Sequence, residues 1–257
     1  MLKTRIIPCL LLRGAGLVKT VRFKDPTYVG DPINAVRIFN DKEVDELVFL
    51  DITATREGRE PNYDVVQTIA SEAFMPLGYG GGVTNLEQMQ RLYAIGVEKV
   101  IINTSAVAKP SLIEDGARMA GSQSVVVSID VKRERSGYAV RTNGGTTDAK
   151  IDPVTFARQC EERGAGEIFL TAMDRDGTQE GYDLELIGKV SSAVSVPVVA
   201  CGGAGGLEDF PTAVASGASA VAAGSLFVFH GKFRAVLITY PDHGSLEALM
   251  KEAERQS

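Results

Sequence analysis

Short apolar runs alternate along the chain with stretches in which apolar residues recur every three or four positions. Continuous runs rich in Val, Ile, Leu and Ala are typical of strands buried on both faces of a parallel sheet. Strands are predicted at residues 5–12, 46–51, 75–78, 100–103, 125–130, 167–171, 197–200 and 220–223. Amphipathic helices are predicted at residues 32–40, 62–72, 86–93, 111–119, 153–163, 184–192 and 207–215. This alternation predicts an α/β fold.

The chain also repeats itself at an offset of 121 residues. The Asp-Pro pair at 31–32 recurs at 152–153. The segment 76–82, which ends in three glycines, recurs as segment 197–203, which ends in two. Each half of the chain therefore carries the same order of strands and helices.

Eight strands, their helices and a two-fold repeat predict one closed barrel. We expect a single (β/α)8 TIM barrel over residues 1–257, with half-barrels at about 1–122 and 123–257. A doubly wound open sheet explains the alternation equally well, but it does not predict a repeat of four strand–helix units. The length of 257 residues is also typical of one such barrel.

Composition excludes several classes of function. The net charge of -6 argues against nucleic acid as a partner, since nonspecific binding needs clustered Lys and Arg. No apolar run is long enough to cross a membrane and no signal peptide precedes the first strand, so we expect a cytoplasmic protein. Cys9, Cys160 and Cys201 are isolated, with His230 and His243 the only histidines. We therefore expect no metal, no disulfide framework and no cofactor.

The polar residues that follow the predicted strands are candidates for the active site. In a TIM barrel the site lies at the carboxyl ends of the strands. The residues expected around this mouth are Leu11, Asp51, Asn103, Asp130, Thr171 and Asp176. Two have a structural alternative: Asp51 as a cap at the strand end, and Asp176, which precedes Gly177, as a turn residue.

Glycine-rich turns follow one predicted strand in each half and could bind phosphate. Backbone without Cβ can approach an anion closely, and a following helix N-terminus offers free N–H groups. The next strand in each half ends in a second group of donors. Candidate phosphate-binding residues are Gly82, Asn103 and Thr104 in the first half and Gly177, Gly203, Gly224 and Ser225 in the second. Tight turns without a ligand are the alternative.

At these residues the chain resembles the cyclase subunit of imidazole glycerol phosphate synthase, a glutamine amidotransferase component of histidine biosynthesis. The similarity covers nearly the whole chain and includes Asn103-Thr104, Asp130 and the segments 3–9, 18–19, 45–54, 80–82, 163–168, 174–178, 181–183 and 200–205. The resemblance implies a two-fold pseudo-symmetric barrel that receives ammonia from a separate glutaminase through its interior. It also implies a lyase-type reaction in which ammonia cleaves and cyclises a doubly phosphorylated ribulosyl substrate.

The resemblance implies two catalytic aspartates, of which this chain keeps one. Asp130 matches the aspartate at the end of the fifth barrel strand, whereas the first strand reads Cys9-Leu10-Leu11 where the family has Cys-Leu-Asp. Leucine cannot transfer a proton. The loop that follows is the family's active-site lid, and it carries Lys19, which we expect to line the acceptor site or to be a solvated loop lysine.

Four charged residues lie at the starts of predicted strands. Strand parity directs Arg5, Lys99 and Glu167 to the barrel interior, and Glu46 is the partner of Glu167 at the repeat offset. A salt-bridged plug of the barrel floor is one interpretation. The resemblance implies another, in which these four form the gate for ammonia and Glu98 belongs to the surface that docks the glutaminase.

The chain keeps the four residues of the implied ammonia gate but has Leu11 in place of a catalytic aspartate. Three hypotheses are consistent with this combination. The first is a changed acceptor. It resembles a divergent branch of surface-polysaccharide (O-antigen, lipopolysaccharide) gene clusters, in which a cyclase-like protein acts with a glutaminase and a sugar amidotransferase to form an acetamidino group on a nucleotide-linked sugar. The second is the histidine-pathway cyclase itself. The third is a catalytically inert scaffold that channels ammonia to another protein.

Overall fold

Eight parallel strands close into a barrel in this computed structural model, which describes residues 4–231 and 233–256. The barrel strands are β1 (Arg5–Arg13), β4 (Leu47–Asp51), β5 (Leu77–Gly80), β6 (Lys99–Ile102), β7 (Val125–Glu134), β10 (Glu167–Ala172), β11 (Val198–Cys201) and β12 (Ala220–Ala223). Each pairs in parallel with the next, and β12 pairs with β1. The predicted (β/α)8 barrel is confirmed, and the open-sheet alternative is wrong because no barrel strand is left at an edge.

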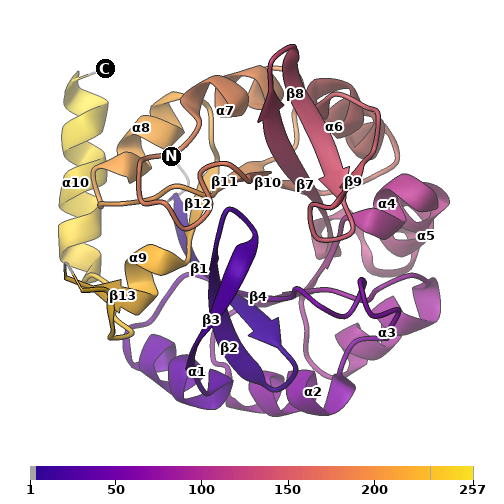
Figure 1. Ribbon diagram of the computed structural model, residues 1–257, viewed down its shortest axis with the longest axis horizontal. Coiled ribbons are helices and arrows are strands. Elements are labelled where there is room, and N and C mark those ends of the chain that lie inside the picture. The colour runs from indigo at the N-terminus through magenta and orange to yellow at the C-terminus, as the bar shows by residue number, and fades with distance from the viewer. Residues whose placement is uncertain (1–3, 232, 257) are drawn as a thin grey trace.

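Helices surround the barrel as an outer ring (Figure 1). They are α1 (Pro32–Asp41), α2 (Tyr63–Glu72), α3 (Leu86–Ala94), α4 (Thr104–Ala108), α5 (Ser111–Ala120), α6 (Pro153–Glu162), α7 (Leu184–Ser191), α8 (Asp209–Ala215), α9 (Ser225–Val228) and α10 (His243–Gln256), with a short 3₁₀ helix, η1 (Ser122–Ser124). No helix in the described part of the chain has the length and apolar character to cross a membrane.

The two helices that follow Asp-Pro pairs begin in the same way. Asp31 Oδ1 accepts hydrogen bonds from the backbone N–H groups of Ile33 and Asn34, at 2.9 and 3.1 Å. Asp152 Oδ1 accepts the equivalent pair in the second half, both at 3.0 Å. Each proline follows as the first helical residue, where its missing N–H is not needed.

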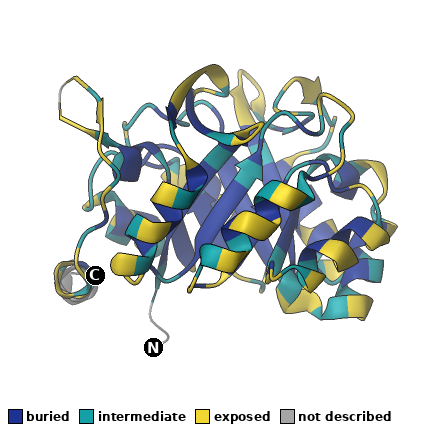
Figure 2. Ribbon diagram, turned by 90° about the horizontal axis from the view of Figure 1, so that it is seen from below, coloured by how far each residue is buried: buried dark blue, intermediate teal, exposed yellow. Residues whose placement is uncertain are grey.

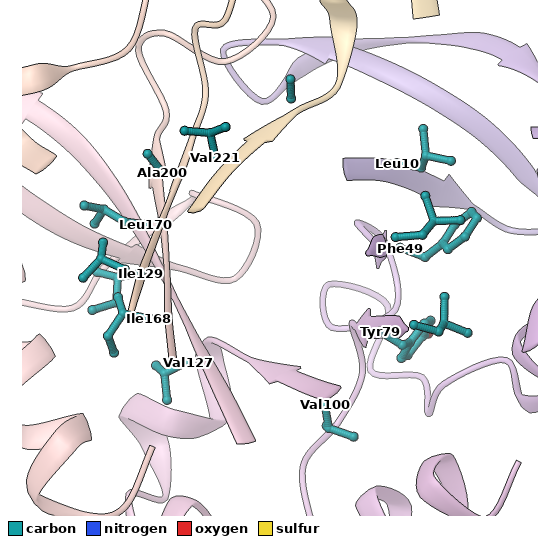
Figure 3. Packing of buried hydrophobic residues seen from close by; sticks show 14 of the residues in the cluster. Leu10, Phe49, Tyr79, Val100, Val127, Ile129, Ile168, Leu170, Ala200 and Val221 are labelled. Atoms are coloured by element: carbon teal, nitrogen blue, oxygen red, sulfur yellow. The ribbon is translucent and has the colours of Figure 1, made fainter. Parts of the chain in front are cut away.

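Side chains of alternate barrel-strand residues pack into two separate apolar clusters. The larger cluster fills the space between strands and helices and includes Leu10, Phe49 and Val127 (Figure 3). The smaller one lies inside the barrel and comprises Ile7, Cys9, Val48, Ile101, Val126, Phe169, Val199, Ala220 and Ala222. The barrel strands are therefore buried on both faces, while the helices expose their outer side (Figure 2).

The pattern of apolar residues misplaces some elements and misses others. The third barrel strand begins at Leu77 rather than Met75, and the helix expected from Leu207 begins at Asp209. Asp209 Oδ2 accepts from the N–H groups of Gly205 and Gly206 at 2.7 and 3.1 Å, which fixes a turn before the helix. The missed strands are β2 (Gly16–Val21), β3 (Lys24–Gly30), β8 (Gly137–Thr142), β9 (Thr147–Asp148), β13 (Phe229–His230) and β14 (Ala235–Val236), and the missed helices are α4, η1, α9 and α10.

The missed strands that extend β1 and β7 lie at the carboxyl end of the barrel. β2 pairs with β1 and β3 in one hairpin, and β8 pairs with β7 and β9 in another. β3 has mostly exposed side chains, so it carries no apolar run to identify it. In Figure 1 the β2–β3 hairpin crosses the open end of the barrel, whereas β8 extends outward at its rim near α6.

Candidate active site

A cavity of about 320 Å³ opens at the carboxyl ends of the barrel strands. All residues expected at the mouth or at the phosphate turns line it: Leu11, Lys19, Asp51, Gly82, Asn103, Thr104, Asp130, Thr171, Asp176, Gly177, Gly203, Gly224 and Ser225. They come from both halves of the chain. Their chemical roles remain predictions.

Asp130, near the end of the barrel portion of β7, is half-buried in this cavity. Its Oδ1 accepts a hydrogen bond from Ser128 Oγ at 3.1 Å. Burial raises the pKa of Asp130 to about 7, and the nearby charge of Asp176 acts in the same direction, although the Ser128 bond opposes both. At neutral pH the carboxyl group is thus divided between its acid and base forms.

Asp176 ties the β2–β3 hairpin to the second half of the barrel. Its Oδ2 accepts from Thr20 Oγ1 at 2.8 Å and from the Phe23 N–H at 3.4 Å. The N–H of Arg22 donates to its backbone oxygen at 2.8 Å. Burial raises the pKa of the Asp176 carboxyl. The hairpin that carries Lys19 is therefore held across the mouth (Figure 1).

Lys19 is not a solvated loop lysine, because only 6% of its surface is exposed. Its Nζ donates to the backbone oxygen of Cys9 at 2.5 Å. Gly224 makes room for it, since a Cβ at that position would lie 2.2 Å from Nζ. Burial lowers the pKa of Lys19, and the charge of Asp176 offsets only part of that effect.

Asp51 forms the strand-end cap that the sequence left as an alternative. Its Oδ1 accepts from the N–H groups of Thr53 and Ala54, at 2.9 and 3.0 Å, and from Thr53 Oγ1 at 3.1 Å. Arg59 approaches Oδ2 to 3.6 Å. Oδ1 therefore stabilises the loop after β4, while Oδ2 accepts none of these bonds and Asp51 still lines the cavity.

Asn103 and Thr104 connect the end of β6 to the β7–β8 hairpin. Asn103 Nδ2 donates to the backbone oxygens of Ser128 and Arg141, at 3.0 and 3.2 Å. Thr104 Oγ1 accepts from the Asn143 N–H at 2.9 Å. These side chains therefore also position the strand that carries Asp130.

The glycine turns have a structural reason to lack side chains. Gly82 and Gly203 adopt φ values of 74° and 116°. A Cβ on Gly82 would lie 2.6 Å from the backbone oxygen of Arg59, and one on Gly203 would lie 2.1 Å from that of Gly181. Both turns thus require glycine for packing against the chain itself, whether or not a phosphate binds. Thr171 lies between these sites, buried on β10.

Ser128, Thr20 and Phe23 are site residues that sequence reasoning missed. Ser128 lies two positions before Asp130, so strand parity alone puts both on one face and could have found it. The other two depend on the hairpin that no apolar run predicts.

Four charged side chains close the opposite end of the barrel. Arg5 donates to Glu46 and to Glu167. Lys99 Nζ donates to the same two carboxylates, at 2.8 Å each. The acids are buried, whereas the cations retain exposed side-chain fractions of 29% for Arg5 and 19% for Lys99. The four form a closed ring of ion pairs, called the floor ring below.

Glu98 lies beside this ring and is exposed. It directly precedes Lys99, and its N–H donates to the backbone oxygen of Leu77 at 2.9 Å. The side chain therefore belongs to the outer surface of the floor.

The chain matches known proteins over nearly its whole length. Residues 5–234 match the model of the family described as histidine biosynthesis protein. A provisionally named imidazole glycerol phosphate synthase subunit hisF2 of Pseudomonas aeruginosa is 55% identical, over 96% of this chain and 99% of the relative. Imidazole glycerol phosphate synthase subunit HisF of Hyphomonas neptunium is 50% identical over 89% and 91%. The chain therefore belongs to the histidine biosynthesis protein family, as a HisF-like cyclase subunit of the imidazole glycerol phosphate synthase type.

Proposed function

We propose that this chain takes ammonia at the floor ring and adds it to a phosphorylated acceptor at the mouth. One observation carries the proposal: a ring of four ion pairs and a carboxyl group with a pKa of about 7 lie at the two ends of one barrel interior. A salt-bridged plug that only closes the barrel floor would not require a titratable carboxyl group at the other end of the interior.

The interior between the two ends suits a small neutral molecule. Its lining is the inner cluster, which includes Ile7, Val48 and Phe169 and offers little to retain a polar solute. Ammonia that enters as the free base would remain neutral there, since ammonium is costly to desolvate. The floor ring would admit it by a rearrangement of its ion pairs.

A glutaminase subunit is the proposed source of the ammonia. It would dock on the floor, where Glu98 is exposed beside Lys99. Docking there would release ammonia directly at the floor ring rather than into solvent.

The proposed work of Asp130 is proton transfer during addition of ammonia. Its pKa of about 7 lets it accept a proton from the attacking nitrogen and return one to a leaving oxygen at neutral pH. Because Leu11 occupies the opposite strand end, this proton transfer would fall to Asp130 without a second carboxylate from β1.

The first candidate acceptor is the doubly phosphorylated ribulosyl substrate of the histidine pathway. It is supported by the relatives named imidazole glycerol phosphate synthase subunit HisF. It also suits the two glycine turns, at the ends of β5 and β11, which are separated by three strands on either side of the eight-stranded barrel. A substrate with a phosphate at each end would span that distance.

A second candidate acceptor is a nucleotide-linked sugar whose N-acetyl group becomes an acetamidino group, in a complex with a sugar amidotransferase for surface polysaccharide. The observation that favours it is Leu11, an apolar side chain in the cavity at the position where the cyclase resemblance implies an aspartate. A diphosphate-linked sugar would need only one of the two phosphate turns.

One assay separates these acceptors. The purified chain is given excess ammonium salt and phosphoribulosyl formimino aminoimidazole carboxamide ribotide, beside a Leu11→Asp variant, and substrate consumption is followed. Turnover by the unmodified chain at a competent rate supports the cyclase and excludes Leu11 as an obstacle. No turnover by the unmodified chain, with activity gained by Leu11→Asp, contradicts the cyclase and supports the changed acceptor.

A further inference from the structure

Lys19 is a buried lysine that forms no ion pair with any carboxylate of the described residues. Among the described residues, Nζ donates to the backbone oxygen of Cys9 and to no carboxylate. Lys99, by contrast, contacts two carboxylates in the floor ring. An ammonium group has three N–H donors, so Lys19 has donors left over for the cavity.

Burial without a counter-ion favours the neutral amine. The lowered pKa of Lys19 follows from the loss of hydration at this position. A neutral lysine side chain is a nucleophile toward carbonyl carbon, and lysines activated in this way form imines with ketones and aldehydes. The environment of Lys19 therefore suits covalent chemistry better than a surface lysine would.

The place of Nζ in the barrel is equally specific. Cys9, whose backbone oxygen holds Nζ, belongs to the inner cluster that lines the barrel axis. Asp130 and Asp176 line the same cavity as Nζ, and the charge of Asp176 acts on Lys19. The amine thus lies where the apolar interior ends and the mouth begins, which is where ammonia would emerge.

We propose that Lys19 forms an imine with the carbonyl carbon of a ketose phosphate acceptor, which ammonia then displaces. This inference rests on the proposed ribulosyl acceptor, which supplies the ketone. It makes Lys19 a catalytic residue rather than only a charge that binds phosphate.

The proposed step balances without a further reactant. The lone pair of Nζ adds to the carbonyl carbon, a proton moves from nitrogen to oxygen, and the carbinolamine loses water to give the imine. Ammonia adds to the same carbon, two protons pass from its nitrogen to Nζ, and the bond between the carbon and Nζ breaks to release the lysine amine. The sum is ketone plus ammonia giving acceptor imine plus water, with Lys19 restored. Asp130, which is close to half-protonated at neutral pH, would carry the protons.

The test traps the imine by reduction. Ribulose 5-phosphate is added to the chain with sodium cyanoborohydride in a buffer free of ammonium, and the intact mass is measured. We expect one adduct, equal to the ketose less one oxygen atom, and peptide mapping should locate it at Lys19. Added ammonium salt should reduce its yield, because ammonia displaces the lysine. Lys99, held by two carboxylates, is the internal control and should stay unlabelled.

Lys19→Arg distinguishes the imine from an anion-binding role, since arginine is a cation that binds phosphate but forms no imine. We expect it to bind ribulose 5-phosphate, give no adduct and lose ammonia-dependent turnover through kcat rather than KM. No adduct in the unmodified chain, equal labelling of surface lysines, or full kcat in Lys19→Arg would overturn the inference. An adduct at Lys19 in a chain that does not consume the histidine-pathway substrate would uphold the lysine's role and reject that acceptor.

Discussion

The two halves of the barrel share a scaffold but differ in the chemistry they carry. Asp31 and Asp152 cap equivalent helices with equivalent hydrogen bonds, and Gly82 and Gly203 make equivalent close contacts. At the mouth, however, the first half contributes Lys19 and Leu11 and the second contributes Asp130 and Asp176. The repeat is thus preserved in packing and capping, while these residues that line the cavity differ between the halves.

The floor ring shows the same division. Its two acids, Glu46 and Glu167, occupy equivalent positions at the repeat offset. Its two cations both come from the first half, and the positions equivalent to Arg5 and Lys99 hold Val126 and Ala220. The first half thus supplies one acid and both cations, and the second half supplies only the other acid. The ring is electrically neutral only when both halves contribute to it.

The largest expected effect comes from Asp130, the proposed proton-transfer group, which lies in the second half. Asp130→Asn keeps the shape and the Ser128 contact but cannot transfer a proton. We expect ammonia-dependent turnover to fall by about 10²–10⁴-fold, measured with ammonium salt so that no glutaminase step contributes. Unchanged turnover in the assembled complex would instead favour the inert-scaffold hypothesis.

The same substitution should alter the pH dependence of stability. The pKa of Asp130 is raised from 3.8 to about 7 in the folded chain, so the folded state binds this proton more tightly than the unfolded chain does. The protonated acid therefore favours folding below about pH 4, and that advantage is lost as pH rises toward 7. Each pKa unit corresponds to about 1.4 kcal/mol. Urea unfolding of the unmodified chain should show this loss, and Asp130→Asn should lack it.

How far sequence could anticipate these features depends on burial. Arg5, Glu46, Lys99 and Glu167 were predictable as a group, because strand parity and the repeat act on buried strands whose side-chain direction is fixed. The burial of Lys19 was not, because it depends on the β2–β3 hairpin crossing to Asp176, a contact between residues more than 150 positions apart. Local sequence patterns do not reveal a contact between residues so far apart in the chain.

The symmetric acids of the floor ring offer a matched pair of variants. Glu46→Gln and Glu167→Gln each remove one charge that pairs with both Arg5 and Lys99. Since each leaves an excess positive charge in a partly exposed ring, we expect equal losses of about 1–3 kcal/mol in the free energy of unfolding. Denaturant titration measures both. A clear inequality would show that the halves do not share the ring evenly.

The two halves also differ on the outer surface of the floor, where the first half exposes an aromatic residue that the second half lacks. Phe74 is 88% exposed, and Asn40 Oδ1 accepts a hydrogen bond from its backbone N–H at 3.0 Å, which holds the backbone that carries the ring. The equivalent position in the second half is Ser195, whose side chain is engaged by Glu161. We expect Phe74→Ser to weaken glutaminase binding by about 1–2 kcal/mol, measured by calorimetry, with turnover on ammonium salt unchanged.

Phe233 provides the control for that prediction. It is 92% exposed, but it lies between β13 and β14, whose neighbour Arg234 donates to the backbone oxygen of Gly177 at the mouth. Phe233→Ser should leave glutaminase affinity as it is. Equal weakening by both variants would mean that exposed aromatic area, rather than the floor, determines the affinity.

The smallest expected effect concerns the two helix caps, which are equivalent in the two halves. Asp31→Ala and Asp152→Ala each remove a carboxylate that accepts two N–H bonds at the start of a helix, and both caps are followed by proline. Each loss should cost about 1 kcal/mol of unfolding free energy, with catalysis unaffected because neither residue reaches the mouth. The two sites are in different halves, so the double variant should lose the sum. A loss of unfolding free energy much larger than the sum would show that the half-barrels unfold as one coupled unit whose repeated helices support each other. A loss in only one of the single variants would show that only one half limits stability.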